Sequence, residues 1–158
     1  MFVVRSVSSK IINMEANPRN LLGCILLVDD DEATNFLNED LLGDLAIAEH
    51  IAVVWNGQRA LDYLLACLAG EPKHTRPDII ILDINMPLMD GFEFLKEYQE
   101  LPPEFRVLIT VVLLSTSSQF EDTSRATDSK IIEHLIEKPL KEEDVWWLVA
   151  HHLERTSM

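Results

Sequence analysis

Residues 79–91 are Ile-Ile-Ile-Leu-Asp-Ile-Asn-Met-Pro-Leu-Met-Asp-Gly, an apolar run that ends abruptly in the carboxylate of Asp83. Two other runs end in charged residues: residues 24–28 are followed by Asp29-Asp30, and residues 134–137 by Lys138-Pro139. Short apolar runs between helical stretches indicate buried strands of a parallel sheet. Because ligands bind beyond the carboxyl ends of such strands, this edge is expected to form a site for a divalent cation and an oxyanion.

A strand–helix alternation extends outward from this stretch. Strands are expected at about Cys24–Val28, His50–Trp55, Asp78–Leu82, Val107–Leu114 and His134–Glu137. Helices are expected at about Glu32–Leu42, Gln58–Ala69, from Asp90-Gly91 to Leu101, at Glu121–Asp128 and after Pro139. Five strands alternating with five helices predict a three-layer α/β sandwich. Residues 1–22 carry no sustained period, so we expect a flexible N-terminal tail (1–22), with Met14 as an alternative start, and one domain at residues 23–158.

Local signals predict how the first helix begins and ends. Asp31 is a favourable N-cap, and Gly43-Asp44 is expected to break the helix. The helix predicted at residues 121–128 has few apolar residues, so it is the least firmly anchored element of the predicted fold.

The tryptophans and the histidine pair are assigned structural roles. Trp55 is expected in the core at the end of the second strand. Trp146 and Trp147 are adjacent and cannot share a helical face, so one is expected to be buried and the other partly exposed. His151-His152 is expected to be a solvated helix end, because adjacent side chains diverge on a helix.

Composition excludes several classes of function. The chain has 158 residues and a net charge of -14, with 27 acids and 13 bases, and such a surface repels nucleic acid and anionic lipid. Cys24 and Cys67 lack the spacing of zinc or redox motifs and are expected to be buried free thiols. No apolar run approaches the roughly 20 residues of a membrane span, and the start is too short for a signal peptide. We therefore expect a cytoplasmic protein with no membrane or nucleic-acid partner.

The charged strand ends are the candidates for chemistry. A carboxylate just past a buried strand, such as Asp83, can act as a nucleophile, whereas the alternative role of Asp83 is a solvated helix cap. Asp29 and Asp30 end the neighbouring strand, and clustered carboxylates are costly unless a cation neutralises them. Oxygen ligands favour magnesium or manganese. Lys138 is a compact partner for a phosphoryl oxygen, and Ser115 offers a hydroxyl at the end of the fourth strand.

In these motifs the chain resembles the receiver domain of two-component response regulators. The resemblance rests on Val28-Asp29-Asp30, the string from Asp83 to Gly91, Leu114-Ser115-Thr116 and Lys138-Pro139, and it covers about Cys24 to Leu153. It implies the flavodoxin-like, CheY-like (βα)5 fold with a parallel sheet of order 2-1-3-4-5. It further implies that Asp83 is the phosphoacceptor and that Lys138-Pro139 is a cis peptide.

The same resemblance implies the remaining site residues and the partners. Asp29, Asp30, Asp83 and the backbone carbonyl of Asn85 would hold Mg2+, while Ser115 and Lys138 would contact the phosphoryl group. The phosphoryl donor would be a sensor histidine kinase or a phosphotransfer protein. The protein would catalyse only its own phosphorylation and dephosphorylation, and it resembles a stand-alone, single-domain regulator.

Signalling in the family often uses an aromatic residue three positions before the lysine, and here that position is Leu135. We therefore expect a switch by backbone and packing movement in the Thr116–Phe120 loop, the fourth helix and the fifth strand. The surface formed by the fourth helix, fifth strand and fifth helix is expected to bind a downstream protein or a second copy of the chain.

Three alternatives remain in view. A haloacid-dehalogenase-type phosphatase needs a second Asp two residues after the nucleophile as general acid–base, and that residue is Asn85. A non-phosphorylated pseudo-receiver would lack a site residue, and none is missing. A flavodoxin-like cofactor binder would need a phosphate-cradling loop after the first strand, and this sequence has acids there.

Overall fold

A computed structural model of the protein describes residues 20–116 and 131–157. Its parallel sheet contains β1 (Leu22–Val28), β2 (Ala48–Val54), β3 (Ile79–Asp83), β4 (Thr110–Ser115) and β5 (Ile132–Glu137). The order is β2-β1-β3-β4-β5, which confirms the expected topology. The helices are α2 (Glu32–Leu45), α3 (Gly57–Leu68), α4 (Gly91–Tyr98), α5 (Pro103–Arg106) and α7 (Glu142–Thr156). The predicted helix at residues 121–128 lies outside the described residues, as do residues 1–19.

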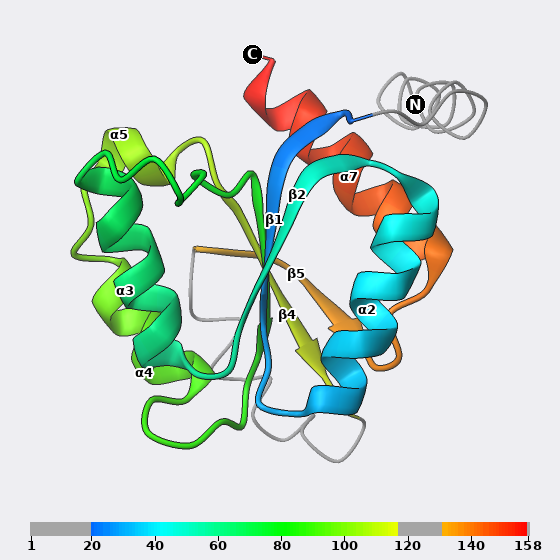
Figure 1. The fold of residues 1–158 in the computed structure, drawn as a ribbon, viewed down its shortest axis with the longest axis horizontal. Coiled ribbons are helices and arrows are strands. Elements are labelled where there is room, and N and C mark those ends of the chain that lie inside the picture. Colours follow the sequence, from blue (N-terminus) through cyan, green and yellow to red (C-terminus); the bar gives the residue numbers. More distant parts are fainter. Residues whose placement is uncertain (1–19, 117–130, 158) are drawn as a thin grey trace.

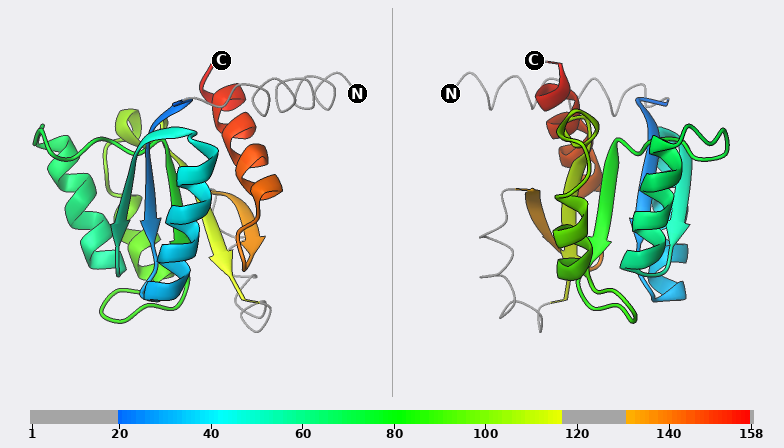
Figure 2. Two further views of the ribbon diagram at one scale, coloured as in Figure 1. Left: turned by 45° about the vertical axis from the view of Figure 1, so that its right-hand side comes forward. Right: turned by 90° about the vertical axis from the view of Figure 1, so that its left-hand side faces the viewer.

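The helices cover both faces of the sheet (Figure 1). On one face, Leu42 of α2 and Val145 and Val149 of α7 pack against inward-facing strand residues. On the other face, Leu64 of α3 and Phe94 of α4 pack against the alternate strand residues. Side chains alternate along a strand, so strands covered on both faces are apolar throughout, and β3 and β4 are buried along their whole lengths. Figure 2 shows the resulting three layers from two further directions.

The parallel order brings the carboxyl ends of β1, β3, β4 and β5 to one edge. Val28 pairs with Leu82, Asp83 with Leu114, and Ser115 with Glu137. Each strand therefore ends within about one residue of its neighbour. This register places the residues that follow the strands side by side.

The first helix differs from its predicted length. Asp31 caps it as expected, by accepting a hydrogen bond from the Thr34 amide. However, Gly43-Asp44 does not break the helix, which continues to Leu45 and ends at Ala46 with a φ of 50°. The chain tolerates Gly43 because Leu42, beside it, is buried in the core, and tertiary packing outweighs the helix propensity of one residue.

Two strand predictions were wrong in detail. Trp55 is not in the core: its side chain is 57% exposed, because β2 is an edge strand and Trp55 lies just beyond its last residue. The fourth strand does not begin at Val107. Pro102-Pro103 starts the short helix α5, and the chain enters the sheet only where the Thr110 amide donates to the Asp78 carbonyl at 2.8 Å.

The C-terminal helix corrects the prediction for the histidine pair. His152 is only 3% exposed, and its Nδ1 lies 2.8 Å from Thr110 Oγ1. The reason is that α7 extends to Thr156 and places Val145, Val149 and His152 on one stripe facing the sheet. The prediction for the tryptophans is confirmed, since Trp146 is buried and Trp147 is partly exposed.

The thiols match the prediction only in part. Cys24 is buried, Cys67 is half-buried, and both are free. Burial raises the pKa of Cys67 to about 11, which keeps this thiol protonated. Among the described residues, no helix is both long enough and apolar enough to cross a bilayer.

Removal of residues 1–20 is expected to leave the fold intact. The sheet starts at Leu22, which pairs with Ala48 and whose amide donates to the Ile47 carbonyl at 2.9 Å. A chain starting at Leu21 should melt within about 3 °C of the full chain, since one surface hydrogen bond is lost. A chain starting at Ile25 serves as the control and should melt far lower, because it loses the buried Leu22. A large loss of stability already at Leu21 would show that the N-terminal segment docks on the domain.

Candidate functional site

The site is built at the carboxyl edge of the sheet from residues that directly follow buried strands. Asp29 follows β1, Asp83 ends β3, Ser115 ends β4 and Lys138 follows β5. Asp29, Asp83 and Ser115 are all buried, although each side chain is polar. The fold thus brings together four residues that lie up to 109 positions apart in the sequence.

Lys138 joins the two buried carboxylates. Its Nζ donates a hydrogen bond to Asp29 Oδ2 at 2.9 Å and lies 3.2 Å from Asp83 Oδ1 in an ion pair. Burial disfavours the ammonium, but the hydrogen bond to Asp29 and the charge of Asp83 outweigh it and raise the pKa of Lys138. Lys138 therefore remains a cation at the site. The Lys138-Pro139 peptide is cis, as expected.

The environment of Asp83 disfavours the charged form of its carboxyl group. Burial of the carboxylate, together with the nearby charge of Asp29, raises the pKa of Asp83 to about 6, and Lys138 only partly opposes this. The positive charge of Lys138 therefore does not fully offset the burial of Asp83 and its repulsion by Asp29. A carboxyl group whose pKa is raised by burial and a specific charged neighbour is a typical functional residue.

The carboxylates of Asp29, Asp30 and Asp83 converge. Each offers a ligand atom, and these atoms all lie within 4.8 Å of one another. Asp29 and Asp83 are buried, whereas Asp30 is exposed. An all-oxygen donor set of this kind suits Mg2+ or Mn2+, so the residues present fit the expected cation. Asn85 is exposed and lies two residues beyond Asp83, and a role for its carbonyl as a ligand stays a prediction.

Ser115 has an unused hydroxyl. The residue is fully buried, and its Oγ makes no hydrogen bond with the part of the chain that the structure describes. A buried polar group without a partner is costly. Its backbone carbonyl accepts a hydrogen bond from the Lys138 amide at 2.7 Å, so Ser115 and Lys138 are held next to each other.

Two residues outside the cluster support the site structurally. The side chain of Asn35 donates to the Asp29 carbonyl at 2.8 Å and so holds the acidic turn in place. Gly91 allows close approach, because a Cβ there would lie 2.6 Å from the Asp83 carbonyl oxygen. The sequence contains no signal for the Asn35 contact, whereas Gly91 was visible as the last residue of the motif.

The free energy of unfolding of Asp83→Asn is expected to exceed that of the unsubstituted protein at neutral pH in EDTA. Because the folded-state pKa is raised to about 6 above the ordinary value of about 4, the native carboxyl holds its proton more tightly than the unfolded one. Stability conferred by that proton is present below pH 4 and is lost as the pH rises through 6. The advantage of the variant should therefore grow by about 1–2 kcal/mol from pH 4 to pH 7.5.

Denaturant unfolding of both proteins at several pH values measures this difference, with Asp90→Asn as a control for the loss of one negative charge. A pH-independent difference between Asp83→Asn and the unsubstituted protein would contradict the raised pKa of Asp83.

Comparison with known proteins agrees with this geometry. The family model for the response regulator receiver domain matches residues 25–149. The chain belongs to this family. The match runs from within β1 into α7, and it makes the protein a receiver domain of two-component signalling, with the family's flavodoxin-like fold.

Individual relatives give the same result. The response regulator Rcp1 of Synechocystis is 35% identical over 109 residues, which are 68% of this chain and 69% of that protein. The Mn2+-bound form of Rcp1 aligns with a TM-score of 0.61 and 25% identity, covering 82% of this chain and 91% of that one.

Two further solved structures are similar. A two-component response regulator from Cytophaga hutchinsonii has a TM-score of 0.76 and 30% identity, covering 86% of this chain and 99% of that one. The phosphorylated cyanobacterial phytochrome response regulator RcpA has a TM-score of 0.64 and 29% identity, covering 84% and 91% of the two chains.

Proposed function

We propose that this receiver domain accepts a phosphoryl group on Asp83 from a sensor histidine kinase or a phosphotransfer protein. The observation that carries the proposal is the buried Asp83 carboxylate, 3.2 Å from the Lys138 ammonium and within the cluster formed with Asp29 and Asp30. A phosphorylated state of the similar protein RcpA supports it. The phosphoryl donors of this pathway are made inside the cell, so the proposal includes the cytoplasmic location expected from the sequence.

The chain's own residues account for the transfer. A carboxylate oxygen of Asp83 attacks phosphorus, and the bond between phosphorus and the donor's imidazole nitrogen breaks with its electron pair returning to the imidazole. Lys138 compensates charge on a phosphoryl oxygen, while the Ser115 hydroxyl, which has no partner within residues 20–116 and 131–157, donates a hydrogen bond to another. In the acyl phosphate, the new phosphoryl oxygens would therefore be contacted by Lys138 and Ser115.

Asp29, Asp30, Asp83 and the carbonyl of Asn85 would hold Mg2+ in this scheme. When bound, the ion neutralises charge as the phosphoryl group approaches the carboxylates. The convergence of the three side chains within 4.8 Å supports this ligand set.

An external phosphoester is not the proposed substrate. Receiver domains are generally signalling modules rather than enzymes, and Asn85 stands where a phosphatase of the haloacid dehalogenase type would need its second acid. The proposed chemistry is therefore limited to the protein's own phosphorylation and dephosphorylation. A pseudo-receiver has less support, because Asp29, Asp83 and Lys138 are present and in contact.

The output is proposed to be a change in a protein-binding surface. Recruitment of Ser115 and Lys138 by the phosphoryl group would move the ends of β4 and β5, whose pairing they continue. The partly exposed Trp147 on α7 lies against the rings of His134 and His151, and it is the candidate anchor for a downstream protein or a second copy. The predicted fourth helix of this surface lies outside the described residues.

Phosphotransfer tests the proposal directly. The protein with Mg2+ and a small phosphodonor should gain the mass of one phosphoryl group, and the label should be released by hydroxylamine, as an acyl phosphate requires. Reduction with borohydride followed by peptide mapping should place it at Asp83. A label that withstands hydroxylamine, or maps to another residue, would overturn the assignment.

The switch is expected to change hydrogen exchange when beryllofluoride, a phosphoryl mimic, is added with Mg2+. Amides around Ser115 and in residues 134–138 should change protection, because the groups that reach the new oxygens lie there. Amides in α3 provide the internal reference, because this helix contains none of the residues that would contact the phosphoryl group. Changes limited to α2 and α3 would show that the signal leaves through a different face.

A further inference from the structure

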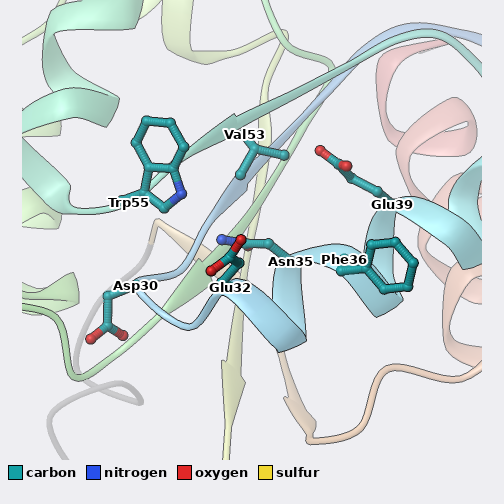
Figure 3. A pocket seen from close by; sticks show the side chains of 7 residues that line it. All are labelled: Asp30, Glu32, Asn35, Phe36, Glu39, Val53 and Trp55. Atoms are coloured by element: carbon teal, nitrogen blue, oxygen red, sulfur yellow. The ribbon is translucent and has the colours of Figure 1, made fainter.

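A cavity of about 560 Å3 lies between α2 and the edge strand β2, next to the site described above. In Figure 3, Trp55 and Phe36 stand at opposite sides of this cavity, with Glu32 and Asn35 between them. We call this hollow the α2–β2 cavity; its remaining lining residues are Asp30, Glu39 and Val53.

The sequence builds this cavity from one face of α2 and the end of β2. Glu32, Phe36 and Glu39 follow one another at spacings of four and three residues, so they share one face of α2, and Asn35 lies on the buried flank of that face. Val53 in β2 and Trp55, just beyond the end of the strand, both line the cavity. Within residues 20–116 and 131–157, Phe36 and Trp55 remain exposed, and β2 is the edge of the sheet.

The cavity offers aromatic surface and hydrogen-bond acceptors. Phe36 is 67% exposed and Trp55 is 57% exposed, which is unusual for side chains of this size. Glu32, Glu39 and Asp30 form no ion pair within residues 20–116 and 131–157. Asn35 is only 5% exposed, and its Oδ1 receives no hydrogen bond from the described residues. The Oδ1 atom is itself buried, so the acceptors that the cavity offers are the three carboxylates. They lie beside the indole ring of Trp55, and the lining includes no Lys, Arg or His.

We propose that the α2–β2 cavity binds an arginine side chain of a protein partner. A guanidinium carries five donors in a planar fork that suits carboxylate acceptors, and it stacks on an indole face. The three carboxylates and the net charge of -14 of the chain supply the complementary field. A lysine ammonium could pair with the carboxylates, but it is a compact charge that cannot stack on the rings of Trp55 and Phe36 as a planar guanidinium does.

This surface shares two residues with the proposed phosphorylation site, namely Asp30 and Asn35, whose side chain also supports Asp29. Asp30 lines the cavity and also belongs to the acidic cluster. Glu32, Glu39 and Trp55 have no part in that cluster, so their substitution tests the cavity alone. The measurement is made on the unphosphorylated protein in EDTA, so that it does not depend on the proposed function.

The experiment titrates the 15N-labelled full chain with acetyl-Gly-Arg-Gly-amide. The neutral citrulline peptide, which keeps the shape but removes the charge, is the matched ligand control. The arginine peptide should shift the Trp55 indole signal and the amides of residues 32–39 saturably at millimolar concentrations, while the indoles of Trp146 and Trp147 on α7 stay unchanged. The citrulline peptide should produce no saturable shift.

Substitutions in the cavity lining test which side chains contribute to binding of the arginine peptide. Trp55→Ala should weaken binding about two- to fivefold, as expected for an exposed cation–π contact. The pair Glu32→Gln/Glu39→Gln should weaken it about five- to tenfold. Glu93→Gln/Glu97→Gln on α4 makes the same charge change elsewhere and should bind as the unsubstituted protein does.

Three results would overturn the proposal. Equal shifts with the citrulline peptide would show that charge is not recognised. Full binding by the Glu32→Gln/Glu39→Gln variant would show that the peptide binds elsewhere. A concentration-dependent dimer in sedimentation that is abolished by Trp55→Ala would assign the face to a second copy of this chain instead.

Discussion

The Asp83→Asn variant is expected to lose phosphorylation by more than about a thousandfold, the largest effect of any single substitution in this chain. The amide cannot attack phosphorus, and no other carboxylate has the same position: Asp29 is engaged by Lys138 and by the Asp31 amide at 2.9 Å each. The fold should survive, because the substitution removes a buried charge that burial and Asp29 already disfavour. Intact mass after incubation with a phosphodonor and Mg2+ measures the loss.

Asp90→Asn is the matched control for this result. Asp90 lies in the same loop and caps α4 by accepting from the Glu93 amide at 2.8 Å, and Asn serves equally well as a cap. This variant should be phosphorylated at nearly the unsubstituted rate. Persistent acyl phosphate on Asp83→Asn would mean that Asp29 or Asp30 is the nucleophile.

Removal of Mg2+ is expected to lower the phosphorylation rate by about a hundredfold or more, because several kcal/mol of charge stabilisation are lost. The three carboxylates lie within 4.8 Å of one another, and Lys138 supplies only one positive charge among them. A dianionic phosphoryl group would otherwise approach an uncompensated acidic cluster. Rates measured in EDTA, and again after Mg2+ is restored, test this expectation.

A pair of neighbouring variants separates metal binding from local structure. Asp30→Asn removes a member of the cluster and should raise the Mg2+ concentration needed for half-maximal rate. Asp31→Asn removes the same charge one residue later but keeps the cap of α2, so it should behave nearly as the unsubstituted protein does. Equal rates with and without EDTA would rule out the metal assignment.

Much of the candidate site was predictable because it follows strand ends. Asp83 and Lys138 each come directly at the end of an apolar run, and the rule that parallel strands present their carboxyl ends at one edge brings them together. Their contact at 3.2 Å therefore needed only the alternation of strands and helices. That the Ser115 hydroxyl finds no hydrogen-bond partner among the described residues was not predictable, since it depends on the position of every neighbouring polar group.

The wrong predictions share a cause. Trp55 was assigned to the core because of its apolarity, but it is exposed because its strand is the sheet's edge. His152 was assigned to solvent because of its polarity, but it is buried because α7 carries it over Thr110. In both cases the prediction followed the burial that is usual for the residue type. The observed burial depends instead on the strand order for Trp55 and on the length of α7 for His152.

The amino-acid sequence by itself determined the element types, the order of the strands through the family motifs, and the group of residues at the carboxyl edge. Those features depend on local periodicity and on residues adjacent to strand ends, which a linear chain records directly. Only the tertiary structure decided the raised pKa of Asp83, the support of Asp29 by Asn35, and the α2–β2 cavity. Each of these depends on burial and distance between segments far apart in the chain, and electrostatic energies change steeply with both.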